Sequence, residues 1–118
     1  LSIVLTEGFA DFVMELSLGR PSLTDAERAA YGLAHEPQLW AELKADIDAG
    51  VMDNADWLYG QGRGGRVNDL GYWIGKRICE AYYAQADDKT AALQTLLKLD
   101  DPAAILAASG YAGRFAPD

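Results

Sequence analysis

The sequence has little of what cross-linked, membrane-spanning or nucleic-acid-binding proteins require. It holds a single cysteine, Cys79, so no disulfide can form within the chain, and the apolar residues around it favour a buried thiol. No uninterrupted apolar run reaches the ~18 residues of a membrane span, and no basic segment typical of a signal peptide opens the chain. Ten Lys and Arg face 18 Asp and Glu, so the formal net charge is −8. We therefore expect a soluble protein, cytoplasmic or exported, with no transmembrane segment and no nucleic-acid partner.

The composition that remains is typical of one folded domain. Hydrophobic residues make up 50% of the chain and charged residues 24%, a balance found in globular proteins and not in disordered ones. A chain of 118 residues is long enough to bury a core. We expect residues 1–118 to form a single domain.

Apolar residues recur at helical spacing along most of the chain, and no segment alternates as a strand does. The sequence therefore predicts an all-α fold, a compact multi-helix domain. Pro37 is expected to begin a new helix, and Thr24 with Glu27 to form a capping box. Asp101, Pro102 and Gly110 mark the two ends of the last helix. The expected helices cover about 3–18, 24–33, 37–50, 69–84, 88–98 and 102–109, with a turn or short helix at 53–59 and a loop at 60–66.

Two carboxylates stand out in the first expected helix. Glu7 and Asp11 are one turn apart and share a face with Ala10 and Met14. The apolar residues around them predict that this face is buried, where a carboxylate needs a partner, and a metal ion is one suitable partner. Glu7 and Asp11 are therefore candidate metal-binding residues.

A second informative block contains Gly71 and Gly75, also one helical turn apart. Two glycines at this spacing remove side-chain bulk from one helix face and let another helix approach closely. One interpretation is tight internal packing. The other is that close packing holds Tyr72 toward a functional site.

These blocks occur in an order that resembles a family of bacterial zinc-dependent proteases, gluzincin-like in motif layout and related to the gliding-motility lipoprotein GldB. The matching blocks span nearly the whole chain: Glu7–Phe12, Asp69–Gly75, Ala81–Tyr83, Asp88–Lys89 and Ser109–Tyr111. The chain departs from the family in lacking an HExxH motif. His35-Glu36 does not begin one, because Pro37 breaks the turn and residue 39 is leucine.

The resemblance implies that the chain is the C-terminal helical half of a gluzincin-like zinc metallopeptidase acting on a protein or peptide. Glu7 would be the third zinc ligand, and Asp11 would accept a hydrogen bond from a ligand histidine. Tyr72 would donate to the oxyanion formed during catalysis. The histidines and the general base would come from a missing N-terminal segment, so the chain alone is expected to be inactive.

Two alternatives stay open at the level of sequence. Tyr72 can instead belong to an aromatic core with Trp73, Tyr82 and Tyr83. The whole chain can instead be a non-catalytic acidic helical module that binds a partner protein. The loop at 60–66 contains glycines and arginines but lacks the Lys-Ser/Thr ending of a phosphate-binding loop, which favours a lid or a connector.

Overall fold

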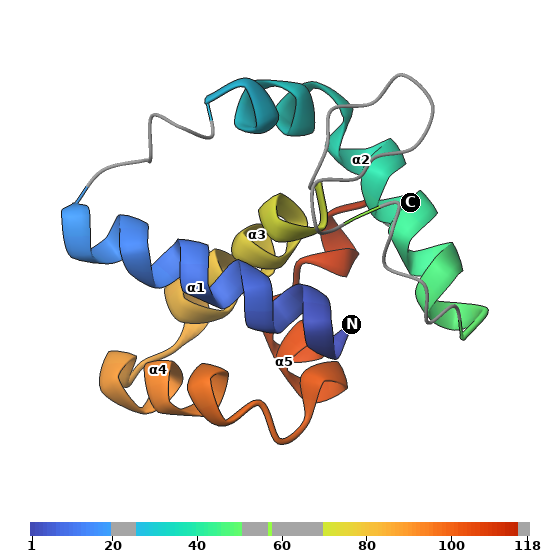
Figure 1. Cartoon of the computed structure of the whole chain (residues 1–118). Coiled ribbons are helices and arrows are strands. Elements are labelled where there is room, and N and C mark those ends of the chain that lie inside the picture. The colour runs from blue at the N-terminus through green and yellow to red at the C-terminus, as the bar shows by residue number, and fades with distance from the viewer. Residues whose placement is uncertain (20–25, 51–56, 58–69, 116–118) are drawn as a thin grey trace.

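The computed structural model describes residues 1–19, 26–50, 57 and 70–115, and all regular structure within these ranges is helical (Figure 1). The all-α prediction is confirmed for this part of the chain. No helix in it is both long enough and apolar enough to cross a membrane. The elements are α1 (Ser2–Leu18), α2 (Ala26–Asp48), α3 (Leu70–Gln85), α4 (Lys89–Lys98), α5 (Pro102–Ser109) and the short 3-10 helix η2 (Ala112–Phe115).

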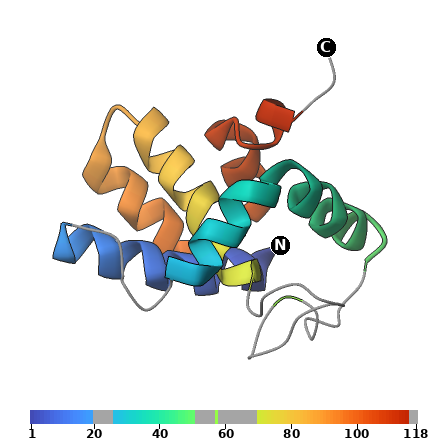
Figure 2. The ribbon, with the colours of Figure 1, turned by 90° about the horizontal axis from the view of Figure 1, so that it is seen from above.

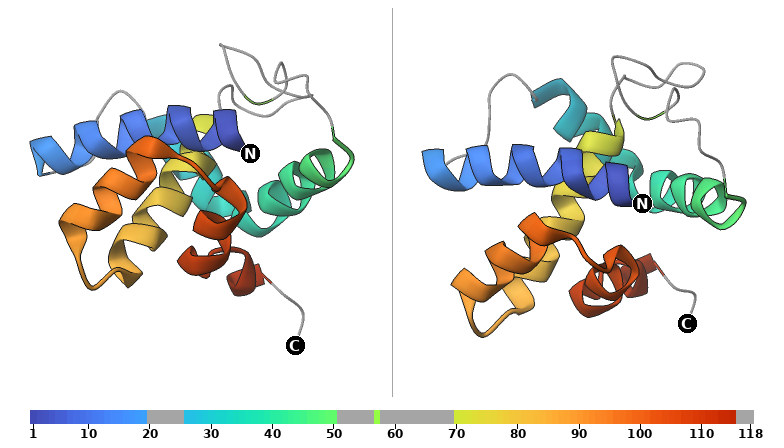
Figure 3. Two further views of the ribbon diagram at one scale, coloured as in Figure 1. Left: turned by 90° about the horizontal axis from the view of Figure 1, so that it is seen from below. Right: turned by 60° about the horizontal axis from the view of Figure 1, so that its bottom comes forward.

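Helix α3 is the centre of the fold, because α1, α2, α4 and α5 all pack against it. Figure 2 shows α4 running back beside α3, and Figure 3 shows α1 crossing the same pair of helices. Ile74, Ile78 and Cys79 of α3 are fully buried. The core therefore surrounds α3 on several sides, which explains why this helix is apolar on more than one face.

The C-terminal helices begin and end where the sequence predicts. The Asp88 carboxylate accepts a hydrogen bond from the Ala91 N–H at 3.0 Å, and Asp101 caps α5 in the same way through Ala104 at 3.1 Å. Pro102 occupies the first turn of α5, and Gly110 ends that helix with a φ of 69°. Local capping signals are thus sufficient to place α4 and α5.

The prediction that Pro37 begins a new helix is wrong, because α2 continues through it from Ala26 to Asp48. Proline removes one backbone hydrogen bond and crowds the preceding turn, and a helix that accommodates it bends. Figures 1 and 2 show α2 changing direction along its length. Gly32 and Glu36 are buried before the proline, and Leu39 after it. Packing on both sides therefore outweighs the cost of the proline.

Several expected features lie outside the described residues. These are the capping residue Thr24, the loop at 60–66 and the segment 53–59 apart from Trp57. The Trp57 side chain is buried, and its indole N–H donates to the Asp46 carboxylate at 2.8 Å. This hydrogen bond attaches Trp57 to the C-terminal half of α2.

Helices α1 and α3 cross at two glycines. A Cβ on Gly75 would lie 2.1 Å from the carbonyl oxygen of Val4, and a Cβ on Gly8 would lie 2.2 Å from the carbonyl carbon of Gly75. The two backbones are therefore in direct contact, with no room for any side chain between them. The packing interpretation of Gly75 is confirmed, and Gly8, inside the first motif, is its counterpart on α1.

The Cys79 thiol should not react with Ellman's reagent in the folded chain at about pH 8. Burial, helped by the negative charge of Glu80, raises the pKa of Cys79 to about 12, so the thiol stays protonated. The side chain is also inaccessible. Unfolding in urea should return the pKa to roughly 8.5 and allow rapid labelling. Fast labelling of the folded chain, followed spectrophotometrically, would contradict the burial of this face of α3.

Candidate functional site

The face of α1 that carries Glu7 and Asp11 is only partly covered by the rest of the described chain. Both acidic side chains are half-buried, while Ala10 is exposed and Met14 is 42% exposed. Ile3, one turn before Glu7, is 38% exposed. The sequence predicts a buried face, and the described helices leave it open because α1 directs the neighbouring face, which carries Val4, Gly8 and Phe12, at the core.

Asp11 and Tyr72 are brought together by a third residue, Arg28 of α2. The Arg28 guanidinium lies 3.9 Å from the Asp11 carboxylate and 5.7 Å from the centroid of the Tyr72 ring. Arg28 thus joins α1, α2 and α3 at one place. Because the Arg28 and Asp11 side chains are 20% and 24% exposed, the ion pair contributes orientation more than stability.

Sequence reasoning missed Arg28. Its position in the first turns of α2 carries no motif, and its partners are distant in the chain. Only a general rule in the sequence points to Arg28. A half-buried carboxylate such as Asp11 requires a cation or a hydrogen-bond donor, and the basic residues of the chain are the candidates.

Glu7 differs from Asp11 in its surroundings. Within the described residues Glu7 forms no hydrogen bond and no ion pair. Its position is nevertheless fixed, because Gly8 contacts the α3 backbone directly. Further along α1, Glu15 forms a buried ion pair with Lys76 of α3, at 2.9 Å. Glu7 therefore projects a carboxylate from a helix that is held at two points.

The described residues contain no group of three or more His, Cys, Asp or Glu side chains placed to hold a metal ion. Zinc sites in proteins commonly use three or four side chains, with histidine or cysteine among them. Glu7 and Asp11 fit one carboxylate ligand and one outer hydrogen-bond partner. They do not form a complete zinc site in these parts of the chain.

Tyr72 is half-buried and packs at the edge of the hydrophobic core, as Tyr82 and Tyr83 also do. Tyr83 meets Phe12 edge to face, with ring centroids 5.4 Å apart. The ring of Tyr72 packs against the core, but the aromatic pairs among the described residues do not join it to Trp73, Tyr82 or Tyr83, so the aromatic-core interpretation stays a prediction. Tyr72 is partly exposed and its ring contacts Arg28. In this position its hydroxyl group can also act as a hydrogen-bond donor.

A buried polar network joins α2, α3 and the C-terminal turn, and sequence reasoning did not find it. The Arg77 guanidinium donates from Nε to Oε1 of Glu36 at 2.9 Å, and the fully buried Tyr111 hydroxyl donates to the same oxygen at 3.0 Å. Arg77 also donates to Glu80 at 3.2 Å. Burial and the negative charge of Glu36 raise the pKa of Tyr111, so its hydroxyl remains a donor.

This network gives the Ser109–Tyr111 motif a structural role. The Tyr111 ring packs edge to face on Trp40 and on Phe115, with centroids 5.3 and 5.1 Å apart. A signal for Glu36 exists in the sequence, since it shares a helix face with Leu39, Trp40 and Leu43. A charged residue on an apolar face predicts a buried ion pair.

Comparison with protein-family models, with curated proteins and with solved structures found no match for this chain.

Proposed function

We propose that this chain is the C-terminal portion of a zinc-dependent metallopeptidase, with Glu7 as the third zinc ligand and two histidine ligands from polypeptide outside these 118 residues. The observation that carries the proposal is the surroundings of Glu7. Its carboxylate has no partner among the described residues, and it shares an open face of a firmly held helix with the exposed side chains of Ile3 and Met14. A segment that covers this face would supply both apolar contacts and the missing ligands.

Under this proposal the other two predicted residues assist Glu7. Bound zinc would polarise a peptide carbonyl and activate a water molecule. The Asp11 carboxylate would accept a hydrogen bond from the outer nitrogen of a ligand histidine and so fix the orientation of its ring. Arg28 would hold that carboxylate and the Tyr72 ring in place. The Tyr72 hydroxyl would then donate to the developing oxyanion of the substrate.

A second candidate function is a non-catalytic acidic module that binds a partner protein. Two observations favour it: Asp11 already has an ion-pair partner within the chain, and Leu18 at the end of α1 is 53% exposed. Together with Ile3 and Met14, Leu18 gives α1 an uncovered apolar surface. A partner helix could pack on it without any metal.

Variants of the protein expressed from its complete open reading frame distinguish the two candidate functions. We expect Glu7→Gln to lower zinc affinity by more than about a hundredfold, because the variant loses a charged ligand, and to abolish hydrolysis of a fluorogenic peptide. Zinc is measured by mass spectrometry after dialysis. Glu27→Gln, an exposed acid in the first turn of α2, is the matched control and should leave both quantities unchanged.

Tyr72→Phe provides an internal comparison. This variant should retain its zinc while kcat falls roughly tenfold to a thousandfold, since only an oxyanion donor is lost. Asp11→Asn should weaken zinc binding on the order of tenfold. Unchanged zinc content in Glu7→Gln would contradict the metallopeptidase proposal and favour the protein-binding module. An unchanged kcat in Tyr72→Phe would leave that residue with a packing role alone.

A further inference from the structure

One stripe of α1 stays largely uncovered along the whole length of the helix. Its positions follow one another at intervals of three or four residues, which places them on one helix face. These positions, here called the α1 stripe, are Ile3, Glu7, Ala10, Met14 and Leu18, and all except the half-buried Glu7 are exposed. The stripe extends over roughly 20 Å, long enough to contact another helix over several turns.

The α1 stripe carries one charge, the Glu7 carboxylate, which has no partner among the described residues. The other two acids of α1 are engaged, Asp11 with Arg28 and Glu15 with Lys76. No basic residue occurs in α1. The helix therefore offers a negative charge between apolar side chains and holds no cation of its own to match it.

A second helix is the shape that fits such a stripe. Side chains at intervals of three and four residues on two helices interlock along their common length, as in coiled coils. An extended peptide needs a free strand edge, and the described part of the chain contains no strand. We therefore expect a helical occupant whose own apolar stripe lies along α1.

Charge distinguishes the possible occupants of the stripe. A second copy of this chain would bring another acidic α1, and the formal net charge of −8 on each copy opposes their approach. Helices that lie on membranes carry Lys and Arg on their polar face, and α1 has neither. A partner with a cation facing Glu7 gains both from the local charge and from the net charge.

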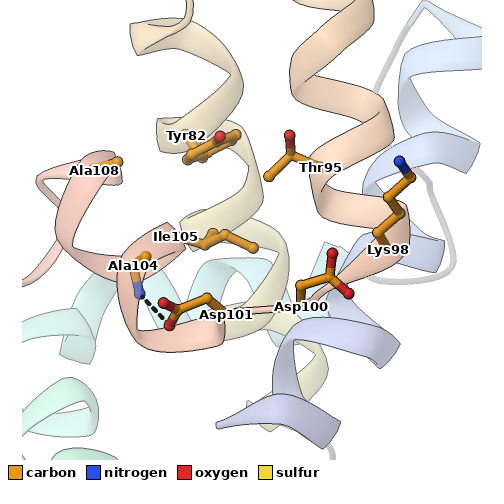
Figure 4. Close-up of a pocket in the computed structure, with 8 residues that line it drawn as sticks. All are labelled: Tyr82, Thr95, Lys98, Asp100, Asp101, Ala104, Ile105 and Ala108. Atoms are coloured by element: carbon orange, nitrogen blue, oxygen red, sulfur yellow. Dashed lines mark hydrogen bonds between the residues drawn. The ribbon is translucent and has the colours of Figure 1, made fainter.

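A cleft of about 430 Å³ between α3, α4 and α5 is a less defined surface (Figure 4). Figure 4 shows the Lys98 side chain directed away from Ile105, which lies inside the cleft. The Asp101 carboxylate is occupied, because it accepts the hydrogen bond from the Ala104 N–H. Neither group is directed at a molecule in the cleft, so we base no ligand on it.

We propose that the α1 stripe binds an amphipathic helix of a partner protein that places a lysine or arginine opposite Glu7. The inference rests on the protein-binding function described above and adds the chemistry of the partner. Apolar contacts with Ile3, Met14 and Leu18 supply affinity. The ion pair with Glu7 selects the partner and its register, as a single polar position within an apolar stripe does in coiled coils.

The test is an NMR titration of the ¹⁵N-labelled 118-residue chain, in EDTA, with synthetic helical peptides. The peptides are about 20 residues long, to match α1, with leucine along one stripe and neutral outer positions. They differ at one central stripe position, which is lysine, glutamine or glutamate. We expect saturable shifts of the α1 amides with the lysine peptide and a Kd on the order of 100 μM. The glutamine peptide should bind roughly two- to fivefold more weakly, and the glutamate peptide more weakly still.

Variants separate the charge from the apolar contacts. Glu7→Gln should remove the preference for lysine over glutamine, whereas Glu27→Gln, at an exposed position of α2, is the control and should preserve it. Met14→Gln should weaken all the peptides roughly three- to tenfold, because an apolar contact is lost. Leu97→Gln, which changes an exposed leucine of α4, should weaken none of them. The amide spectrum of each variant reports whether it is folded.

Two results would overturn the inference and leave the protein-binding function in place. The first is equal affinity for all the peptides, and the second is a lysine preference that persists in folded Glu7→Gln. The absence of saturable shifts with any peptide at millimolar concentration would overturn both. Because EDTA removes free metal ions, none of these results depends on the zinc measurements that test the metallopeptidase proposal.

The other occupants are tested with the chain alone. Dimerisation that shifts the α1 amides, followed by diffusion measurements at increasing protein concentration, would assign the stripe to a second copy and overturn the inference. Binding to vesicles of phosphatidylcholine and phosphatidylglycerol through the same amides would assign it to a membrane surface, with the same consequence. We expect neither.

Discussion

Gly75→Ala is expected to lower the free energy of unfolding by roughly 3 kcal/mol or more. The added methyl group would lie 2.1 Å from the Val4 carbonyl oxygen, and both atoms are attached to helix backbone that cannot move aside locally. Helix α1 would have to shift away from α3. The effect opposes intrinsic propensity, since alanine favours a helix over glycine by roughly 1 kcal/mol.

Urea unfolding followed by circular dichroism measures this change. Gly113→Ala is the matched control, because a Cβ at Gly113 has no atom within 4 Å. Its stability should stay within about 0.5 kcal/mol of the parent. A Gly75→Ala variant that is as stable as the parent, or more stable, would show that the two helix backbones do not meet at this crossing.

Glu36→Leu is expected to cost about 3 kcal/mol of stability. Leucine preserves much of the volume, but it leaves the fully buried Tyr111 hydroxyl without its acceptor and takes from Arg77 its closest carboxylate. The Arg77 side chain is 26% exposed, so water compensates part of the charge. Glu80→Gln, at the more exposed end of the network, should cost less than about 1 kcal/mol.

A double variant tests whether Glu36 and Tyr111 act together. Tyr111→Phe should destabilise the parent measurably and have a smaller effect in the Glu36→Leu background, since the hydrogen bond is already lost. Equal effects in both backgrounds would show that the two residues contribute independently. Stability is again measured by urea unfolding of all four proteins.

Local signals were sufficient for much of this fold. Asp101 caps α5 as its sequence position predicts, Asp88 caps α4 at the predicted start of that helix, and Gly110 ends α5. Pro37 was not predictable in the same way, because a local rule ends a helix at proline while burial of Glu36 and Leu39 keeps α2 continuous. Where local and tertiary preferences agree, sequence alone places the element.

The candidate site was predictable only in the part that depends on helix periodicity. The spacing of Glu7 and Asp11 places them on one face of α1 without any knowledge of the rest of the fold. Arg28 could not be identified, because its contacts with Asp11 and Tyr72 depend on how three helices pack. The roles proposed for Glu7, Asp11 and Tyr72 stay predictions.

The polar links across the core have a consequence for synthesis of the chain on the ribosome. Glu15 pairs with Lys76, 61 residues later, and Glu36 accepts its hydrogen bond from Tyr111, 75 residues later. Helices α1 and α2 therefore emerge before α3, the helix on which both pack, has been made. Synthesis at roughly 5–20 residues per second is far slower than helix formation, so α1 and α2 wait for α3 to be made. The nascent protein thus exposes the apolar faces of its first two helices until α3 has been made, and this interval is when it most needs protection by chaperones.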